Sequence, residues 1–164
     1  MNLPEAPHVA LVRILVDGYS LLHAWPELSP GAARHSHAAR EALITVLQRY
    51  RDATHTPITV VFDGQGAPAG TPKLPSNANL EILFSTQGKT ADDLIERAAY
   101  RLKEYGEVLV VTDDNAERDT VRSFGVNTLS CCGFIREMET TIADQAGDLK
   151  RLNRAESERW RHRK

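Results

Sequence analysis

Acidic residues recur where the predicted strands end or where the next helices begin. In chain order they are Asp17, Asp63, Asp92, Asp93, Asp113 and Asp114. In an open α/β sheet, ligands bind at the edge formed by the carboxyl ends of the parallel strands. Carboxylates that converge there repel one another unless a cation neutralises them, and oxygen-only ligands favour Mg²⁺ or Mn²⁺. The pattern predicts a metal site able to activate water and to stabilise charge on a phosphodiester.

The elements that must position these acids alternate between strands and helices. Near-continuous apolar runs, typical of strands buried on both faces, predict strands at 8–16, 57–62, 80–84, 107–111 and 126–130. Helices are expected at about 33–52, 90–105, up to about 124, and from near 134 into the C-terminal tail. Residues 65–79 are rich in Gly and Pro, which predicts a loop. We therefore expect one α/β domain with a central, mostly parallel five-stranded sheet flanked by helices.

Helix geometry separates the two neighbouring acids of the segment at 90–105. Thr90 is a good N-cap, and Asp93 stands three residues later, as in a capping box. With a buried stripe at Ala91, Ile95, Ala98 and Leu102, Asp93 points nearly opposite the core. Asp92 falls on the border of that stripe, so its side chain can reach a cleft beside the sheet. Metal binding is therefore favoured for Asp92 and capping for Asp93.

The other acids each have a simpler explanation when taken singly. Asp is common in strand-to-helix turns because it caps the helix, which suits Asp17 and Asp114. Asp63 stands in an Asp-Gly pair, an ordinary turn sequence. The joint pattern, not any one residue, therefore predicts the metal site.

Composition limits the classes of protein to consider. The chain has 164 residues, of which 41% are hydrophobic and 26% charged, as in a soluble domain. No apolar run is long enough to span a membrane, and the first residues do not resemble a signal peptide. The two cysteines are adjacent and form no metal-binding spacing, so we expect a reducing cytoplasm and no structural zinc.

Charge is spread unevenly along the chain. Residues 150–164 contain seven Lys or Arg and two Glu, a net charge of +5, which leaves −7 for residues 1–149 because the total is −2. An acidic body with a basic tail fits a carboxylate metal site beside an arm that attracts phosphates. A solvated helix end explains the tail equally well. We divide the chain into a domain at 8–148 and a basic helical tail at 149–164.

Several short motifs occur in an order that suggests a family. They are ILVDGYSLLHAWPEL at 14–28, VVFD at 60–63, KTADDLI at 89–95, VVTDDNAE at 110–117 and SFGV at 123–126. Together they resemble the YacP-like NYN branch of the PIN-like ribonucleases over about residues 10–135. The resemblance implies a PIN-like fold, Mg²⁺ or Mn²⁺ dependence and endonucleolytic cleavage of RNA. It also suggests single-stranded substrates, including messenger RNA near ribosomes.

Residue by residue, the resemblance assigns roles to the acids. Asp17, Asp92 and Asp114 match the family's metal-binding, catalytic acids, and Asp63 and Asp93 match neighbouring acidic positions. Asp113 stands where the family has a small polar residue, so it is expected to support the metal ligands. Ser20 replaces the family's usual Asn, and either residue can hydrogen-bond a neighbouring carboxylate or the substrate. The expected substrate contacts are Ser20, Tyr19, Lys89 and Asn115.

Two other functions stay open. Ser20, as a departure from the family pattern, allows a PIN-like RNA-binding module that has lost its chemistry. A metal-dependent phosphatase for small molecules would also use the acids, although the basic tail favours a polymer. Nucleotide binding by a P-loop is rejected, because Leu83 stands where the pattern ending at Gly88-Lys89-Thr90 requires glycine. Trp25 could stack on bases, but packing is the favoured role for it.

Overall fold

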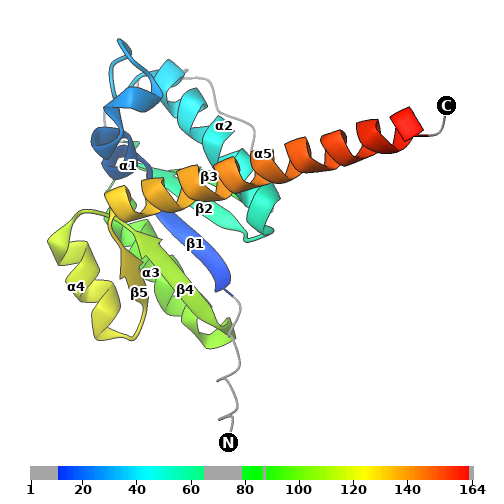
Figure 1. The fold of residues 1–164 in the computed structure, drawn as a ribbon. Coiled ribbons are helices and arrows are strands. Elements are labelled where there is room, and N and C mark those ends of the chain that lie inside the picture. Colours follow the sequence, from blue (N-terminus) through cyan, green and yellow to red (C-terminus); the bar gives the residue numbers. More distant parts are fainter. Residues whose placement is uncertain (1–10, 65–78, 87, 163–164) are drawn as a thin grey trace, which may run out of the picture.

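The computed structural model describes residues 11–64, 79–86 and 88–162 (Figure 1). Its strands are β1 (Leu11–Asp17), β2 (Ile58–Phe62), β3 (Leu80–Phe84), β4 (Glu107–Val111) and β5 (Asn127–Leu129). Its α-helices are α1 (Gly18–Ala24), α2 (His37–Thr54), α3 (Ala91–Leu102), α4 (Asn115–Ser123) and α5 (Cys131–His162). Two short 3-10 turns, η1 (Pro26–Leu28) and η2 (Lys103–Tyr105), follow α1 and α3.

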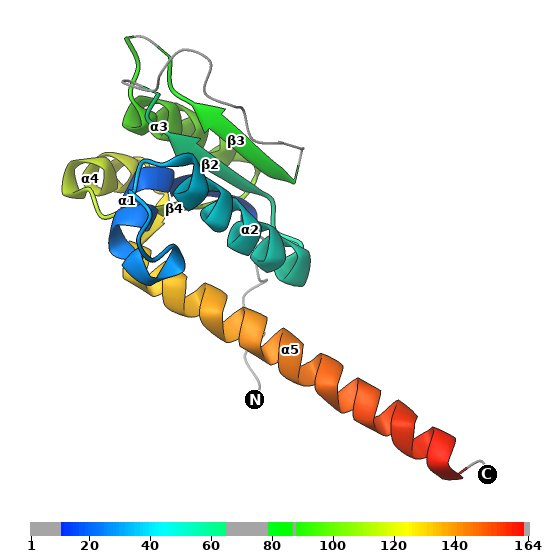
Figure 2. The same cartoon turned by 90° about the horizontal axis from the view of Figure 1, so that it is seen from above.

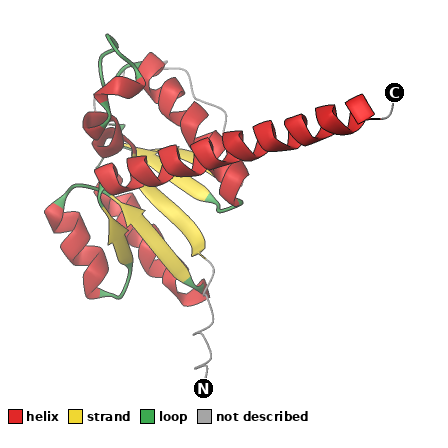
Figure 3. Cartoon of the chain, in the orientation of Figure 1, coloured by secondary structure: helices red, strands yellow, loops and turns green. Residues whose placement is uncertain are grey.

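The five strands form one parallel sheet in the order β3-β2-β1-β4-β5. β1 is therefore central. The chain adds β2 and β3 on one side of it, and then β4 and β5 on the other side. Helices cover both faces of the sheet (Figure 3). The predicted single α/β domain with a five-stranded parallel sheet is confirmed. Because all strands run the same way, the segments that follow β1, β2, β3 and β4 all leave the sheet at one edge.

Alternate residues of the central strand supply two separate cores. Ile14 and Val16 pack with side chains of α1, α2 and the first turns of α5. Leu15, which points to the other face, packs with side chains of α3 and α4. Burial on both faces explains why the strands read as continuous apolar runs.

The helices differ from the predicted ranges at their ends. α1 is a separate helix, which we did not predict, and it begins directly after β1. α2 begins at His37 because the Ser36 side chain accepts a hydrogen bond from the Ala39 amide and so caps the helix. α5 begins at Cys131, three residues before the predicted start. The predicted loop at 65–79 lies, apart from residue 79, outside the described residues.

The second half of α5 extends away from the rest of the domain (Figures 1 and 2). Phe134, Ile135 and Met138 are buried against the sheet, whereas nearly every residue from Ala143 to His162 is exposed. The helix continues without a break through the predicted boundary between domain and tail. Within the described part of the chain, no helix has both the length and the apolar character needed to cross a membrane.

A close approach at Gly18 fixes the start of α1 against the sheet. A Cβ built on Gly18 would lie 2.4 Å from Cε1 of Phe62, a fully buried side chain that stacks on Phe84 with ring centroids 5.4 Å apart. The same ring also packs against Tyr19, with ring centroids 5.1 Å apart. The absence of a side chain at Gly18 therefore lets α1 begin directly after Asp17.

We expect Gly18→Ala to lower the free energy of unfolding by about 1–3 kcal/mol, because the new methyl group must displace the packed Phe62 ring. Gly147→Ala is the matched control: its Cβ would meet only Arg151 Nη2, at 3.7 Å, on an exposed helix. That change should be neutral or stabilise by up to about 1 kcal/mol. Urea denaturation of both variants measures the difference. Equal effects would contradict the packing argument.

Candidate metal centre

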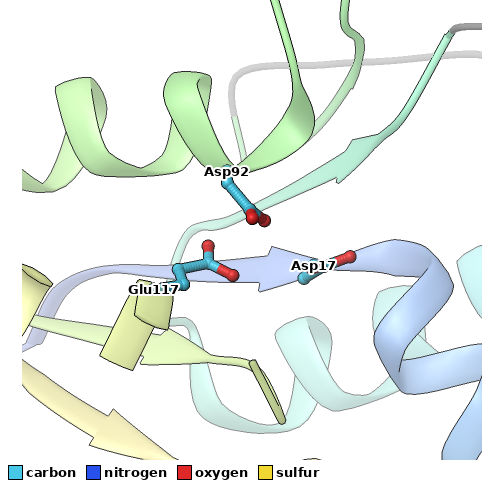
Figure 4. Close-up of side chains that lie close together, drawn as sticks. All are labelled: Asp17, Asp92 and Glu117. Carbon is cyan, nitrogen blue, oxygen red and sulfur yellow. The ribbon is translucent and has the colours of Figure 1, made fainter. Parts of the chain in front are cut away.

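Three carboxylates from different elements lie together at the carboxyl edge of the sheet. Asp17 ends β1, Asp92 is in the first turn of α3 and Glu117 is in the first turn of α4. One carboxylate oxygen from each lies within 4.8 Å of the others. Asp92 and Glu117 point toward one another, and Asp17 lies beside them at the end of β1 (Figure 4). We call Asp17, Asp92 and Glu117 the acidic cluster.

Asp17 is held in place by the start of α1. It is the N-cap of that helix, and its Oδ1 accepts a hydrogen bond from the Ser20 amide at 3.3 Å. The Ser20 side chain also hydrogen-bonds this carboxylate. Burial raises the pKa of Asp17 to about 6, with further contributions from the charges of Asp92 and Asp114. Ser20 thus provides the contact to a carboxylate expected of the Asn that it replaces.

Glu117 is the most deeply buried member of the cluster. Its side chain is only 1% exposed, and Thr112, at the end of β4, donates its hydroxyl proton to Glu117 Oε2 at 2.8 Å. Its other oxygen, Oε1, is buried and accepts no hydrogen bond from the described residues. Burial raises the pKa of Glu117 to about 9, and the negative charges of Asp17 and Asp92 add to this rise. The raised pKa agrees with the absence of a cationic partner for Glu117 among the described residues.

The two acids of α3 separate as helix geometry predicted. Thr90 and Asp93 form a full capping box: Asp93 accepts from the Thr90 amide at 3.1 Å, and Thr90 accepts from the Asp93 amide at 3.2 Å. Asp93 is exposed. Asp92 instead turns toward Glu117, and burial, followed by neighbouring negative charges, raises its pKa. The predicted capping box is therefore confirmed, and Asp92 is the acid of this pair that joins the cluster.

The donor set of the cluster fits a hard divalent cation. It offers only carboxylate oxygens, which Mg²⁺ and Mn²⁺ prefer. Without a cation, the short Asp92–Glu117 approach is tolerable only if one carboxyl keeps a proton, which agrees with the raised pKa of Glu117. A bound cation would replace that proton and satisfy the buried oxygen. The cluster can therefore hold a metal ion.

Three other predicted acids lie nearby and make different contacts. Asp114 is the N-cap of α4 and accepts from the Glu117 amide at 3.0 Å, so it positions the backbone that carries Glu117. Asp113 accepts from the Cys131 amide at 2.9 Å, which ties β4 to the start of α5. Asp63 accepts from the Ser85 hydroxyl at 3.1 Å. Among the described residues, only the three members of the acidic cluster meet as a group of metal-binding side chains.

The predicted substrate contacts differ in their surroundings. Lys89 and Asn115 are exposed, in the segment before α3 and at the first position of α4. Tyr19 is half-buried in α1, and its hydroxyl accepts a hydrogen bond from Arg40 at 3.3 Å. Trp25 is half-buried and packs against the core that contains α1 and α2, as favoured from the sequence. Lys89 and Asn115 are therefore free of the packing that holds Tyr19.

Glu117 is the member of the cluster that sequence analysis did not select. The signal was available: Glu117 and Val121 are one helical turn apart, and they are the two buried residues of α4. A carboxylate on the core-facing stripe of a helix is costly unless it is paired. Asp113 and Asp114 stand in the strand-to-helix turn, where acids are expected, whereas Glu117 lies in the first turn of the helix itself. The buried position three residues later carries the side chain that reaches the cluster.

Comparison with known proteins gives a consistent result. The model of the YacP-like NYN domain family matches residues 14–164. The protein YacP of Bacillus subtilis (strain 168) is 33% identical over 128 residues, which cover 77% of this chain and 75% of YacP. A crystal structure of Rae1 (YacP) from Bacillus subtilis aligns with a TM-score of 0.70 and 30% identity, covering 89% of this chain and 82% of that one.

A second crystal structure of Rae1 (YacP), from a point mutant, aligns with a TM-score of 0.72 and 28% identity over 86% of this chain and 82% of that one. The family match implies a nuclease-type function connected with RNA. The resemblance first suggested by the ordered motifs is confirmed over nearly the whole chain. The chain belongs to the YacP-like NYN domain family.

Proposed function

We propose that this protein is a metal-dependent endoribonuclease that hydrolyses phosphodiester bonds of RNA. The observation that carries the proposal is the acidic cluster, in which the buried Glu117 lies beside Asp92 and Asp17, at the carboxyl edge of a nuclease-type fold. A buried acid that serves only stability would have a cationic partner at that depth, and among the described residues Glu117 has none. A binding site for a catalytic cation would explain why these carboxylates lie close together although they repel one another.

In this proposal Asp17, Asp92 and Glu117 hold Mg²⁺ or Mn²⁺. The ion would lower the pKa of a bound water and stabilise negative charge on the phosphate. Asp114 accepts a hydrogen bond from the Glu117 amide, which holds Glu117 in place, and its charge adds to the negative charge of the site. Hydrolysis by water would leave a 5′-phosphate and a 3′-hydroxyl. Because Ser20 reaches Asp17, the substitution of the family's Asn no longer favours an inactive domain.

The proposed substrate is single-stranded RNA. The family supports an RNA substrate, and the basic second half of α5 supports a polymer rather than a small phosphate ester. Messenger RNA near the ribosome, in the cytoplasm, is the substrate that the resemblance suggests.

We expect Asp92→Asn to lower RNA cleavage by orders of magnitude, because it removes a metal-binding oxygen while keeping the size of the side chain. Asp93→Asn is the matched control, since it changes the adjacent, exposed acid of the capping box. It should cost about 1 kcal/mol or less of stability and little activity. The measurement is cleavage of labelled RNA in Mn²⁺, with and without chelator. Normal cleavage by Asp92→Asn would place the site elsewhere.

Stability should depend on pH and metal together. Asp17 and Glu117 have folded-state pKa values of about 6 and 9, above their ordinary values of 3.8 and 4.5. The unfolded chain therefore loses these protons first, so the metal-free protein should lose stability as pH rises from about 4 to 9. Mn²⁺ binds the ionised carboxylates, so it should raise the melting temperature more at pH 8 than at pH 5.5.

Glu117→Gln provides the control for this pH dependence. It keeps a buried polar side chain of similar size, so the metal-free variant should be more stable than the wild type at pH 8 and its melting temperature should vary less with pH. The Mn²⁺ shift should also shrink. Differential scanning calorimetry from pH 5 to 9 measures both effects. An identical pH profile for wild type and variant would contradict the assignment of the buried charge.

Deleting Glu158 to Lys164 removes four basic residues and one acid from the tail. If the tail recruits RNA without taking part in the chemistry, the deletion should weaken RNA binding and flatten its salt dependence. Cleavage at saturating RNA should persist. Anisotropy titrations at several salt concentrations test this, and an unchanged salt slope would rule out recruitment by the tail.

A further inference from the structure

Arg40, on α2, is a buried cation that has no anionic partner among the described residues. Its side chain is only 5% exposed. No Asp or Glu among the described residues forms an ion pair with it. A buried guanidinium in this state is costly, because its charge has lost water and gained no counter-charge.

The hydrogen bonds of Arg40 leave much of its binding capacity unused. Nη1 donates to the His35 carbonyl at 2.6 Å and to the Tyr19 hydroxyl at 3.3 Å. Nε is buried and has no partner among the described residues. The guanidinium also lies over the Phe84 ring, 5.9 Å from its centroid. These contacts fix the position of the group but use only one of its three nitrogens, although a guanidinium carries five N–H donors.

The guanidinium lies at the same edge of the sheet as the acidic cluster. Tyr19 follows Asp17 by two residues, and Phe84 is the last residue of β3. The groups around Arg40 are only partly covered: Tyr19 and Phe84 are half-buried, and His35 is exposed. The guanidinium therefore lies beneath partly exposed side chains, on the β3 side of Asp17, at the edge of the sheet where the acidic cluster lies.

We propose that Arg40 binds a phosphate group of the RNA on the β3 side of the acidic cluster. This inference rests on the proposed ribonuclease function and adds a substrate-binding residue to it. The planar fork of N–H donors in arginine matches phosphate oxygens, and such charge-assisted bonds are strong. Residues 1–149 carry a net charge of −7, so a polyanion needs a local cation beside the carboxylates. Tyr19 and Phe84 hold the guanidinium ready for this contact.

A purely structural role predicts a different result. If Arg40 only links the His35 segment to α1, removing it should lower stability and leave RNA binding unchanged. If Arg40 binds a phosphate, replacing it with an apolar side chain of similar length should keep or raise the stability of the RNA-free protein. RNA binding should fall at the same time. Stability and affinity, measured on one variant, therefore separate the two roles.

The test uses Arg40→Met in the Asp92→Asn background, where cleavage does not consume the probe. Fluorescence anisotropy measures binding of a fluorescein-labelled single-stranded RNA at several salt concentrations. We expect affinity to fall about ten-fold or more, and the salt slope to decrease by about 0.7, the value for one phosphate contact on a single strand. The melting temperature without RNA should be unchanged or higher. Arg49→Met, an exposed position of the same helix, is the matched control.

The outcomes distinguish this inference from the proposed function. Binding by Arg40→Met equal to that of Arg49→Met overturns the role of Arg40. A wild-type protein that binds RNA through Arg40 but never cleaves it in Mn²⁺ leaves this inference intact and overturns the ribonuclease function. If Arg40→Met does not fold, Arg40→Lys replaces it: the charge stays and the fork is lost, so affinity should fall several-fold with the salt slope unchanged. Wild-type affinity of that variant also overturns the proposal.

Discussion

Electrostatic repulsion among carboxylates that share one partly buried space is the constraint on which the site depends. Parallel strands bring Asp17 and the turns before α3 and α4 to one edge of the sheet. Burial then removes the acids from the water that would screen their charges. The molecule does not relieve this by moving the side chains apart. Burial and repulsion instead raise the pKa values of Asp17 and Glu117, so that these carboxyl groups keep protons and carry less negative charge until a cation binds.

Rigid supports around the cluster are needed because repelling groups would otherwise separate. Each acid is placed by the first turn of a helix, and each of these helices is capped: α1 by Asp17, α3 by Thr90 and α4 by Asp114. Thr112 adds a second support, because its hydroxyl accepts from the Asp114 amide and donates to Glu117. Asp17 therefore serves as a cap and as a member of the cluster, whereas at α3 and α4 the cap and the cluster acid are different residues of the same turn. The same turns serve both.

The fold and part of the site could be predicted because the relevant signals are local. Apolar runs mark the strands, and the position of Asp92 relative to the stripe of α3 gave the direction of its side chain. Glu117 and Arg40 were missed for a shared reason. Each is a charged residue on the buried face of a helix. Whether such a residue meets a partner of opposite charge depends on how α4 and α2 pack in the fold, which the local sequence pattern does not show. The start of α5 has a local signal, because the Ser130 hydroxyl accepts from the Gly133 amide at 3.1 Å, and a non-local one, the contact of Asp113 with the Cys131 amide 18 positions away.

The length of α5 sets a minimum span for any RNA that contacts both the tail and the metal centre. The helix begins beside the carboxyl edge of the sheet and has 32 residues. At 1.5 Å per residue, the tail at 149–164 begins about 27 Å from the start of the helix, and the far end lies about 48 Å from it. Short oligonucleotides can occupy one of the two places but cannot bridge them. Apparent affinity should therefore increase once the RNA is long enough to reach the tail. The tail should have no effect on the binding of dinucleotide-sized substrates.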